Sequence, residues 1–73
     1  MKEGNFKEPR VCIVRFKEGK PFTVPECVGV YVSKVVSIIY PYNGKTRRYK
    51  FPRKDIILIT AGDEVMYSDR WIK

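Results

Sequence analysis

Most of the positive charge of this chain lies in one short stretch of the sequence. Six basic residues and no acidic residue lie between Pro41 and Lys54, whereas the other nine basic residues nearly balance the eight acidic ones. The six are Lys45, Arg47, Arg48, Lys50, Arg53 and Lys54. The net charge of +7 is therefore mainly a local feature. Clustered lysine and arginine side chains bind the phosphates of a nucleic acid or the carboxylates of an acidic protein.

The residues of this sequence leave few catalytic options. The sequence has no histidine, which excludes histidine-dependent triads and histidine metal sites. Cys12 and Cys27 form no CxxC pair and cannot alone complete a tetrahedral zinc site. We find no glycine-rich phosphate or dinucleotide motif and no HExxH, and the carboxylates are scattered among turn-like segments. We therefore expect a protein that is not an enzyme and that holds no cofactor or metal.

The length and the hydropathy pattern limit the possible architecture and cellular location of the protein. A chain of 73 residues makes one domain with a single core, and its stability is expected to be a few kcal/mol. No apolar run approaches the ~20 residues of a membrane span, and residues 1–8 contain no apolar export segment. We expect a cytoplasmic monomer without membrane contact, and two buried, reduced cysteines; a single disulfide is the alternative for an exported protein.

The first third of the chain predicts two strands. Residues 1–10 are polar and are expected to form a flexible arm. Val11–Phe16 is rich in β-branched and aromatic residues, and Phe22–Val24 is expected to return beside it after a turn. The sequence Thr-Val-Pro-Glu that follows has the spacing of a helix capping box, so a short helix or helical turn is predicted near residues 24–29.

The strongest local signal is a β-hairpin around Asn43-Gly44. Residues 30–42 are rich in Val, Ile, Tyr and Ser, and the Asn-Gly pair fits a two-residue type I′ turn. This turn would place Tyr42 opposite Lys45. The further pairs would be Tyr40 with Arg47, Ile38 with Tyr49, and Val36 with Phe51. One face of the hairpin would be aromatic and aliphatic, and the other mixed and basic.

The last third predicts one more strand and a tail. Ile56–Thr60 is apolar at four consecutive positions, which is typical of a strand covered on both faces. Residues 65–73 are expected to be either a packed segment or a tail that orders on a partner. The predicted fold is mainly β, or small α+β. It is a twisted antiparallel sheet of four to five strands, partly curled toward a barrel, with one short helix or helical turn and a single β-rich domain at 11–64.

Three interpretations of the basic stretch remain open from the residues alone. The cations could meet an acidic protein, they could bind nucleic acid phosphates while nearby tyrosines stack on bases, or they could be a solvated face that aids solubility. Arg70 and Trp71 near the carboxyl terminus join the six cations as candidate partner-binding residues.

A sequence resemblance favours the first interpretation, in which the cations meet an acidic protein. From Met1–Phe6 through Tyr40–Lys45 to Ser68–Lys73, the length and general sequence character are similar to those of a small transcription regulator of a Xanthomonas-infecting phage. The resemblance implies a protein that binds bacterial RNA polymerase in the host cytoplasm, at the amino-terminal region of the β′ subunit with a second contact on the β subunit. It further implies displacement of the sigma factor during initiation, and antitermination later. Weak, non-specific nucleic-acid contact is expected in addition, and a basic nucleic-acid-binding β module is the alternative function.

Overall fold

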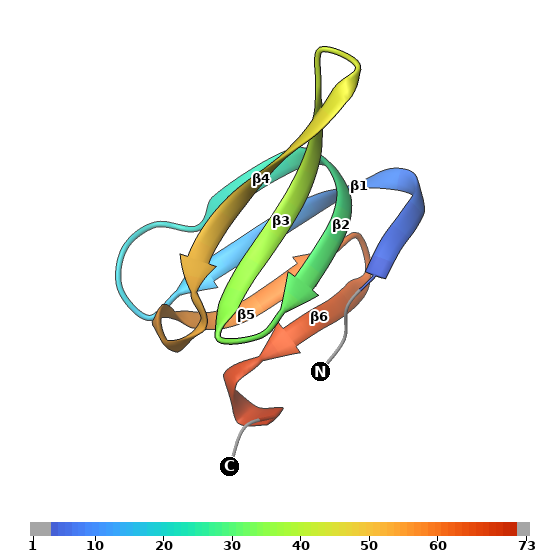
Figure 1. The fold of residues 1–73 in the computed structure, drawn as a ribbon. Coiled ribbons are helices and arrows are strands. Elements are labelled where there is room, and N and C mark those ends of the chain that lie inside the picture. Colours follow the sequence, from blue (N-terminus) through green and yellow to red (C-terminus); the bar gives the residue numbers. More distant parts are fainter. Residues whose placement is uncertain (1–3, 72–73) are drawn as a thin grey trace.

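The computed structural model describes residues 4–71 as one antiparallel sheet of six strands (Figure 1). The strands are β1 (Gly4–Phe16), β2 (Phe22–Val32), β3 (Val35–Tyr42), β4 (Lys45–Pro52), β5 (Ile56–Ala61) and β6 (Glu64–Ser68). A 3-10 turn, η1 (Arg53–Asp55), lies between β4 and β5, and a second one, η2 (Asp69–Trp71), follows β6. The mainly β class is confirmed, with six strands instead of four to five. Residues 1–3 of the expected arm and 72–73 of the expected tail lie outside the described part.

The strand order across the sheet is β4-β3-β2-β1-β5-β6. Within the described residues, β4 and β6 are therefore the two edges of the sheet, and they do not pair to close a barrel. Alternation along β1 buries Cys12 and Val14 completely on one face, as the sequence predicts. The core also contains Val24, Val30, Val36, Ile38, Ile56, Ile59 and Met66. No helix among the described residues is long and apolar enough to cross a membrane.

Strand β2 runs without interruption through residues 24–29, where the capping-box spacing predicts a helical turn. That prediction is wrong because the segment pairs with β1: Val24 lies opposite Cys12, and Cys27 lies opposite Arg10. Strand pairing with a distant part of the chain satisfies these backbone groups, so tertiary context overrides the local signal. A bend at Ser33 and Lys34 separates β2 from β3, so residues 30–42 belong to two strands.

Strand β1 begins at Gly4, so residues 4–10 lie in the sheet and not in an arm outside it. Phe6 packs against the core, and the Cζ atom of Arg10 lies 4.2 Å from the centroid of the Phe6 ring. The Arg10 guanidinium also donates a hydrogen bond of 2.8 Å to Glu64 Oε1 in β6. The bond to Glu64 joins residues that are 54 positions apart in sequence, and a polar composition gives no sign of it.

Strand β6 places the first part of the expected tail in the sheet beside β5. Met66 and Tyr67 are only 3% and 2% exposed, so this part is a packed segment. Coverage of β5 on both faces is not observed, because Ile57 is 40% exposed and only Ile56, Ile59 and Ala61 of this strand are fully buried. The sheet therefore extends beyond both ends of the domain that the sequence predicts.

The two cysteines are free thiols buried in the core, on the neighbouring strands β1 and β2. Cys27 donates a hydrogen bond of 3.2 Å to the carbonyl oxygen of Gly29. A hydrogen bond with Cys27, together with burial, raises the pKa of Cys12 well above its usual range. The same hydrogen bond lowers the pKa of Cys27 to about 7, against the opposing effect of burial. Both side chains pack as small hydrophobic groups.

Candidate binding surface

Asn43 and Gly44 form the turn between β3 and β4, with φ values of 50° and 76°. A type I′ turn needs positive φ at both central positions, and asparagine and glycine adopt it with the least strain. Tyr42 lies opposite Lys45, and the predicted pairs farther from the turn are all present. The predicted turn and register are therefore both confirmed.

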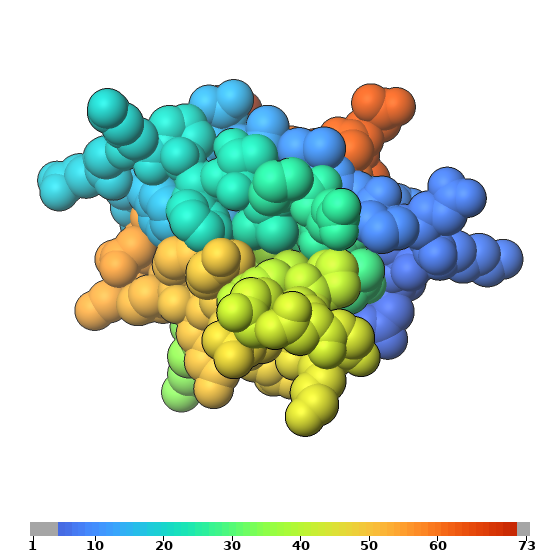
Figure 2. All heavy atoms as spheres, turned by 90° about the horizontal axis from the view of Figure 1, so that it is seen from above, coloured from blue at the N-terminus to red at the C-terminus, as the bar shows by residue number. Residues whose placement is uncertain are grey.

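The end of this hairpin projects beyond the rest of the sheet (Figure 1). It does so because β3 pairs with β2 only as far as Ile39, so that the chain from Tyr40 to Arg47 is a ribbon of two strands. Figure 2 views the molecule from above, with this ribbon nearest the reader. Every residue from 41 to 50 is exposed, and the side chains here are open to a partner.

Four of the predicted cations lie on β4, distributed over both faces of the ribbon. Lys45 and Arg47 lie on the face that also carries Tyr40, whereas Arg48 and Lys50 alternate onto the opposite face. None of the β3 residues that pair with β4 is acidic. The hairpin therefore supplies no counter-charge of its own, and both faces attract anionic groups.

A row of aromatic rings fixes the base of the hairpin to the core. Tyr49 stacks on Tyr40 with ring centroids 4.5 Å apart, and Phe22 meets Tyr49 edge-on at 4.8 Å. Phe51 continues the row and meets Phe16 edge-on at 5.2 Å. Each pair of this kind contributes about 0.5–1.5 kcal/mol beyond its buried area. Desolvation and the neighbouring Tyr49 raise the pKa of Tyr40, so this phenol stays neutral near pH 7.

The two exposed tyrosines of the hairpin are already in contact with other side chains. Tyr42 is 46% exposed, and the Cζ atom of Arg47 lies 4.2 Å from its ring centroid. Tyr49 is 37% exposed, and one face of its ring is covered by Tyr40. Neither ring therefore offers two free faces on which a base could stack.

Arg53 and Lys54 lie at the other end of β4, away from the turn. The N–H group of Arg53 donates a hydrogen bond of 3.0 Å to the carbonyl oxygen of Lys34, and the N–H group of Lys17 donates one of 2.9 Å to the carbonyl oxygen of Asp55. These bonds bring four basic residues around one open hollow of about 550 Å³. Lys17 and Lys34 were missed by the sequence analysis because they lie in separate turns between other strands.

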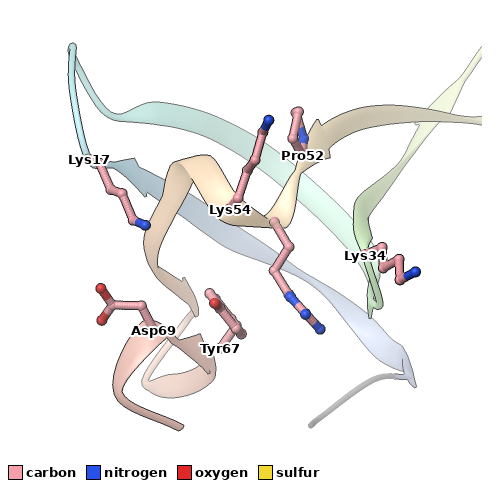
Figure 3. A pocket seen from close by; sticks show the side chains of 7 residues that line it. Lys17, Lys34, Pro52, Lys54, Tyr67 and Asp69 are labelled. Atoms are coloured by element: carbon pink, nitrogen blue, oxygen red, sulfur yellow. The ribbon is translucent and has the colours of Figure 1, made fainter. Parts of the chain in front are cut away.

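Figure 3 shows how the side chains lie around this hollow. Tyr67 and Asp69 line it opposite η1, and the amine groups of Lys34 and Lys54 point away from them. The amine groups of Lys34 and Lys54 therefore do not converge with the other cations on one bound anion. This end of the molecule is a diffuse basic surface, and the dense cluster of cations is on the hairpin.

Arg70 and Trp71 form part of η2, beyond the end of β6. Both are exposed, and Trp71 retains 46% of its surface. The backbone N–H of Arg70 donates a hydrogen bond of 3.3 Å to Ser68 Oγ. In Figure 1 this turn lies at the opposite end of the molecule from the hairpin tip, so these two candidates do not join the hairpin cations.

Over the described residues, no group of three or more histidine, cysteine or carboxylate side chains is placed to hold a metal ion. No protein family, curated protein or solved structure matches this chain.

Proposed function

We propose that this protein is a non-enzymatic, phage-type transcription regulator that binds bacterial RNA polymerase through the β3–β4 hairpin. The amino-terminal region of the polymerase β′ subunit is the main contact, with a second contact on the β subunit. Binding favours a state of the polymerase that the sigma factor does not fit, which inhibits initiation, and it promotes antitermination later. The sequence resemblance supplies the identity of the partner.

The observation that carries the proposal is the projecting ribbon with exposed cations on both faces and no acidic residue beside them. A large acidic assembly attracts such a surface over a distance, and the attraction speeds association. The molecule is 38 Å long, and Arg53, Lys54, Arg70 and Trp71 lie away from the hairpin tip. These residues are available to the second contact, and a domain of this size can supply the ~800 Å² per partner of an ordinary interface.

A nucleic-acid-binding module is the second candidate, because exposed lysine and arginine side chains suit phosphates equally well. Modules that bind single strands also stack bases on aromatic rings. Here Arg47 covers one face of Tyr42, and Tyr40 covers one face of Tyr49. These contacts leave each ring less surface on which a base could stack, so the proposal gives nucleic acid a weak, non-specific contact that is mainly to phosphates.

The test is capture of partners from a bacterial lysate by the tagged protein, followed by mass spectrometry. Polymerase subunits should be recovered with the natural sequence and lost with Arg47→Glu, Arg48→Glu and Lys50→Glu combined, because the reversal repels an acidic surface. Purified polymerase holoenzyme should then lose sigma-dependent initiation when the natural protein is added.

A control triple variant keeps the same change of net charge but places it elsewhere. Lys7→Glu, Arg15→Glu and Lys20→Glu alter three exposed residues outside the hairpin, and this variant should still capture polymerase. Recovery of no polymerase subunit by the natural protein would contradict the proposal. Equal loss in both triple variants would assign the effect to net charge and not to the hairpin.

A further inference from the structure

Strand β4 is an edge of the sheet along its whole length. Within residues 4–71 it has β3 on one side and no strand on the other. An edge strand presents a row of unpaired backbone N–H and C=O groups, which can accept a further strand from another chain. The other edge, β6, has five residues and carries no basic side chain.

The register identifies which backbone groups of β4 point outward. In a two-residue hairpin the residues that flank the turn, Tyr42 and Lys45, exchange both backbone hydrogen bonds, and bonded and non-bonded pairs then alternate. The N–H groups of Thr46, Arg48 and Lys50 therefore point away from β3. Pro52, which has no N–H, falls in this outward set, as an edge position permits.

The charges of β4 select what can pair with this edge. A second copy of the chain would bring the same cations against themselves, and like charges on neighbouring strands destabilise the pairing. An acidic strand would place carboxylates beside Arg48 and Lys50 on one face and beside Lys45 and Arg47 on the other. The edge is thus protected from self-association and remains open to an acidic partner.

We infer that β4 is a docking edge, and that an acidic, extended segment of a partner protein binds by adding to it as a seventh strand. Backbone hydrogen bonds to Thr46, Arg48 and Lys50 hold the segment, and the cations on the two faces select its acidic side chains. The inference rests on the proposed function in taking a protein as the partner, and it specifies how that protein is held.

The first test uses the unmodified protein and a synthetic peptide that alternates glutamate and valine. A twin peptide with every internal amide N-methylated keeps the charge and side chains but cannot form the ladder through either of its edges. The plain peptide should bind at least about tenfold more tightly than the twin, because the twin cannot complete the backbone hydrogen bonds. It should also slow hydrogen exchange at the amides of Thr46, Arg48 and Lys50. Equal binding of the two peptides would overturn the inference.

The second test uses purified bacterial RNA polymerase and two variants of one uncharged position. Thr46→Pro removes an outward N–H without changing charge, whereas Thr46→Ala keeps that N–H and serves as the control. The proline variant should bind polymerase about tenfold or more weakly than the alanine variant. Equal melting temperatures of the two variants would show that the fold is intact, since proline is tolerated at edge positions.

The two tests separate failure of the inference from failure of the proposed function. If Thr46→Pro and Thr46→Ala bind polymerase equally well, strand addition is wrong while polymerase binding stands. If the natural protein binds no polymerase, the proposed function is wrong, and the peptide pair alone decides on strand addition.

Discussion

The guanidinium group of Arg47 lies over the ring of Tyr42, with Cζ 4.2 Å from the ring centroid. The two residues are on opposite strands of the hairpin, and the contact holds one cation of β4 in a fixed position near the turn. It also covers a ring face that could otherwise stack on a base. The interaction orients one charge and occupies one of the two faces of the Tyr42 ring, which under the proposed function suits a protein partner.

Replacing the ring of Tyr42 should therefore weaken binding to polymerase. Tyr42→Leu removes the cation–π contact, which is worth about 0.5–1 kcal/mol at an exposed site, so affinity should fall about twofold to fivefold. Tyr42→Phe keeps the ring and should bind as the natural protein does. Titration of both variants against purified polymerase checks this, and equal affinities for the two would show that the contact has no role in binding.

Substitution of Gly44 tests whether the turn between β3 and β4 needs a residue with positive φ. Its φ of 76° is positive, and a Cβ atom added there would meet nothing within 4 Å, so the cost of substitution is backbone strain alone. Gly44→Val should lower the free energy of unfolding by roughly 1 kcal/mol or more, whereas Gly44→Asn should cost much less. Chemical denaturation of the two variants measures the difference. Equal stabilities would mean that the turn does not need a left-handed residue.

Tyr67 and Trp71 should behave differently although both belong to the expected tail. Tyr67 is 2% exposed in β6, so Tyr67→Ala should destabilise the protein by about 3 kcal/mol or more. Trp71 is 46% exposed, so Trp71→Ala should change stability by no more than about 0.5 kcal/mol. Thermal melts compare the two. A loss of polymerase binding by Trp71→Ala with an unchanged melt would assign the tryptophan to the second contact.

The buried thiols should react only when the sheet opens. Cys12 and Cys27 are both fully buried, so a thiol reagent should modify the native protein slowly and the unfolded protein rapidly. The reaction rate should rise with denaturant in parallel with the unfolded fraction. Rapid modification of the native protein would contradict the core position of these residues, and a missing thiol in non-reducing buffer would indicate a disulfide.

The hairpin could be predicted from sequence because its determinants are local. Asn43-Gly44 selects the turn, and the turn fixes every pair from Tyr42 with Lys45 outward. The exposure of cations on both faces does not follow from this register, because it depends on where the pairing of β3 with β2 ends, at Ile39. The sequence shows which residues of the ribbon are charged and on which face each of them lies.

The rest of the sheet depends on contacts that are distant in sequence. Gly4 and Asn5 join β1 because Val30 and Gly29 of β2 lie beside them, and no local pattern marks this pairing. The helical signal near residues 24–29 fails for the same reason, since pairing with the distant strand β1 outweighs a capping box.

The candidate binding residues lie on two separate surfaces for a similar reason. Arg53 directly follows β4 in sequence, but η1 places it at the opposite end from the turn, beside Lys17 and Lys34. Sequence proximity therefore grouped six cations that the fold divides into two surfaces. The division depends on how three separate turns meet, which charge patterning along the chain does not reveal.

The most direct measurement of the central claim is the affinity of the natural protein for polymerase and for free nucleic acid as a function of salt. Both affinities should be measured between ~50 and 300 mM salt, with duplex DNA and single-stranded RNA as the nucleic acids. Nucleic-acid binding releases condensed counterions and should fall steeply, within the non-specific range of ~10⁻⁴ to 10⁻⁶ M at physiological salt. Polymerase binding should be tighter and should survive moderate salt, because a desolvated interface core persists when rim charges are screened. Submicromolar binding to free nucleic acid at physiological salt, with no binding to polymerase, would contradict the account and establish the nucleic-acid module instead.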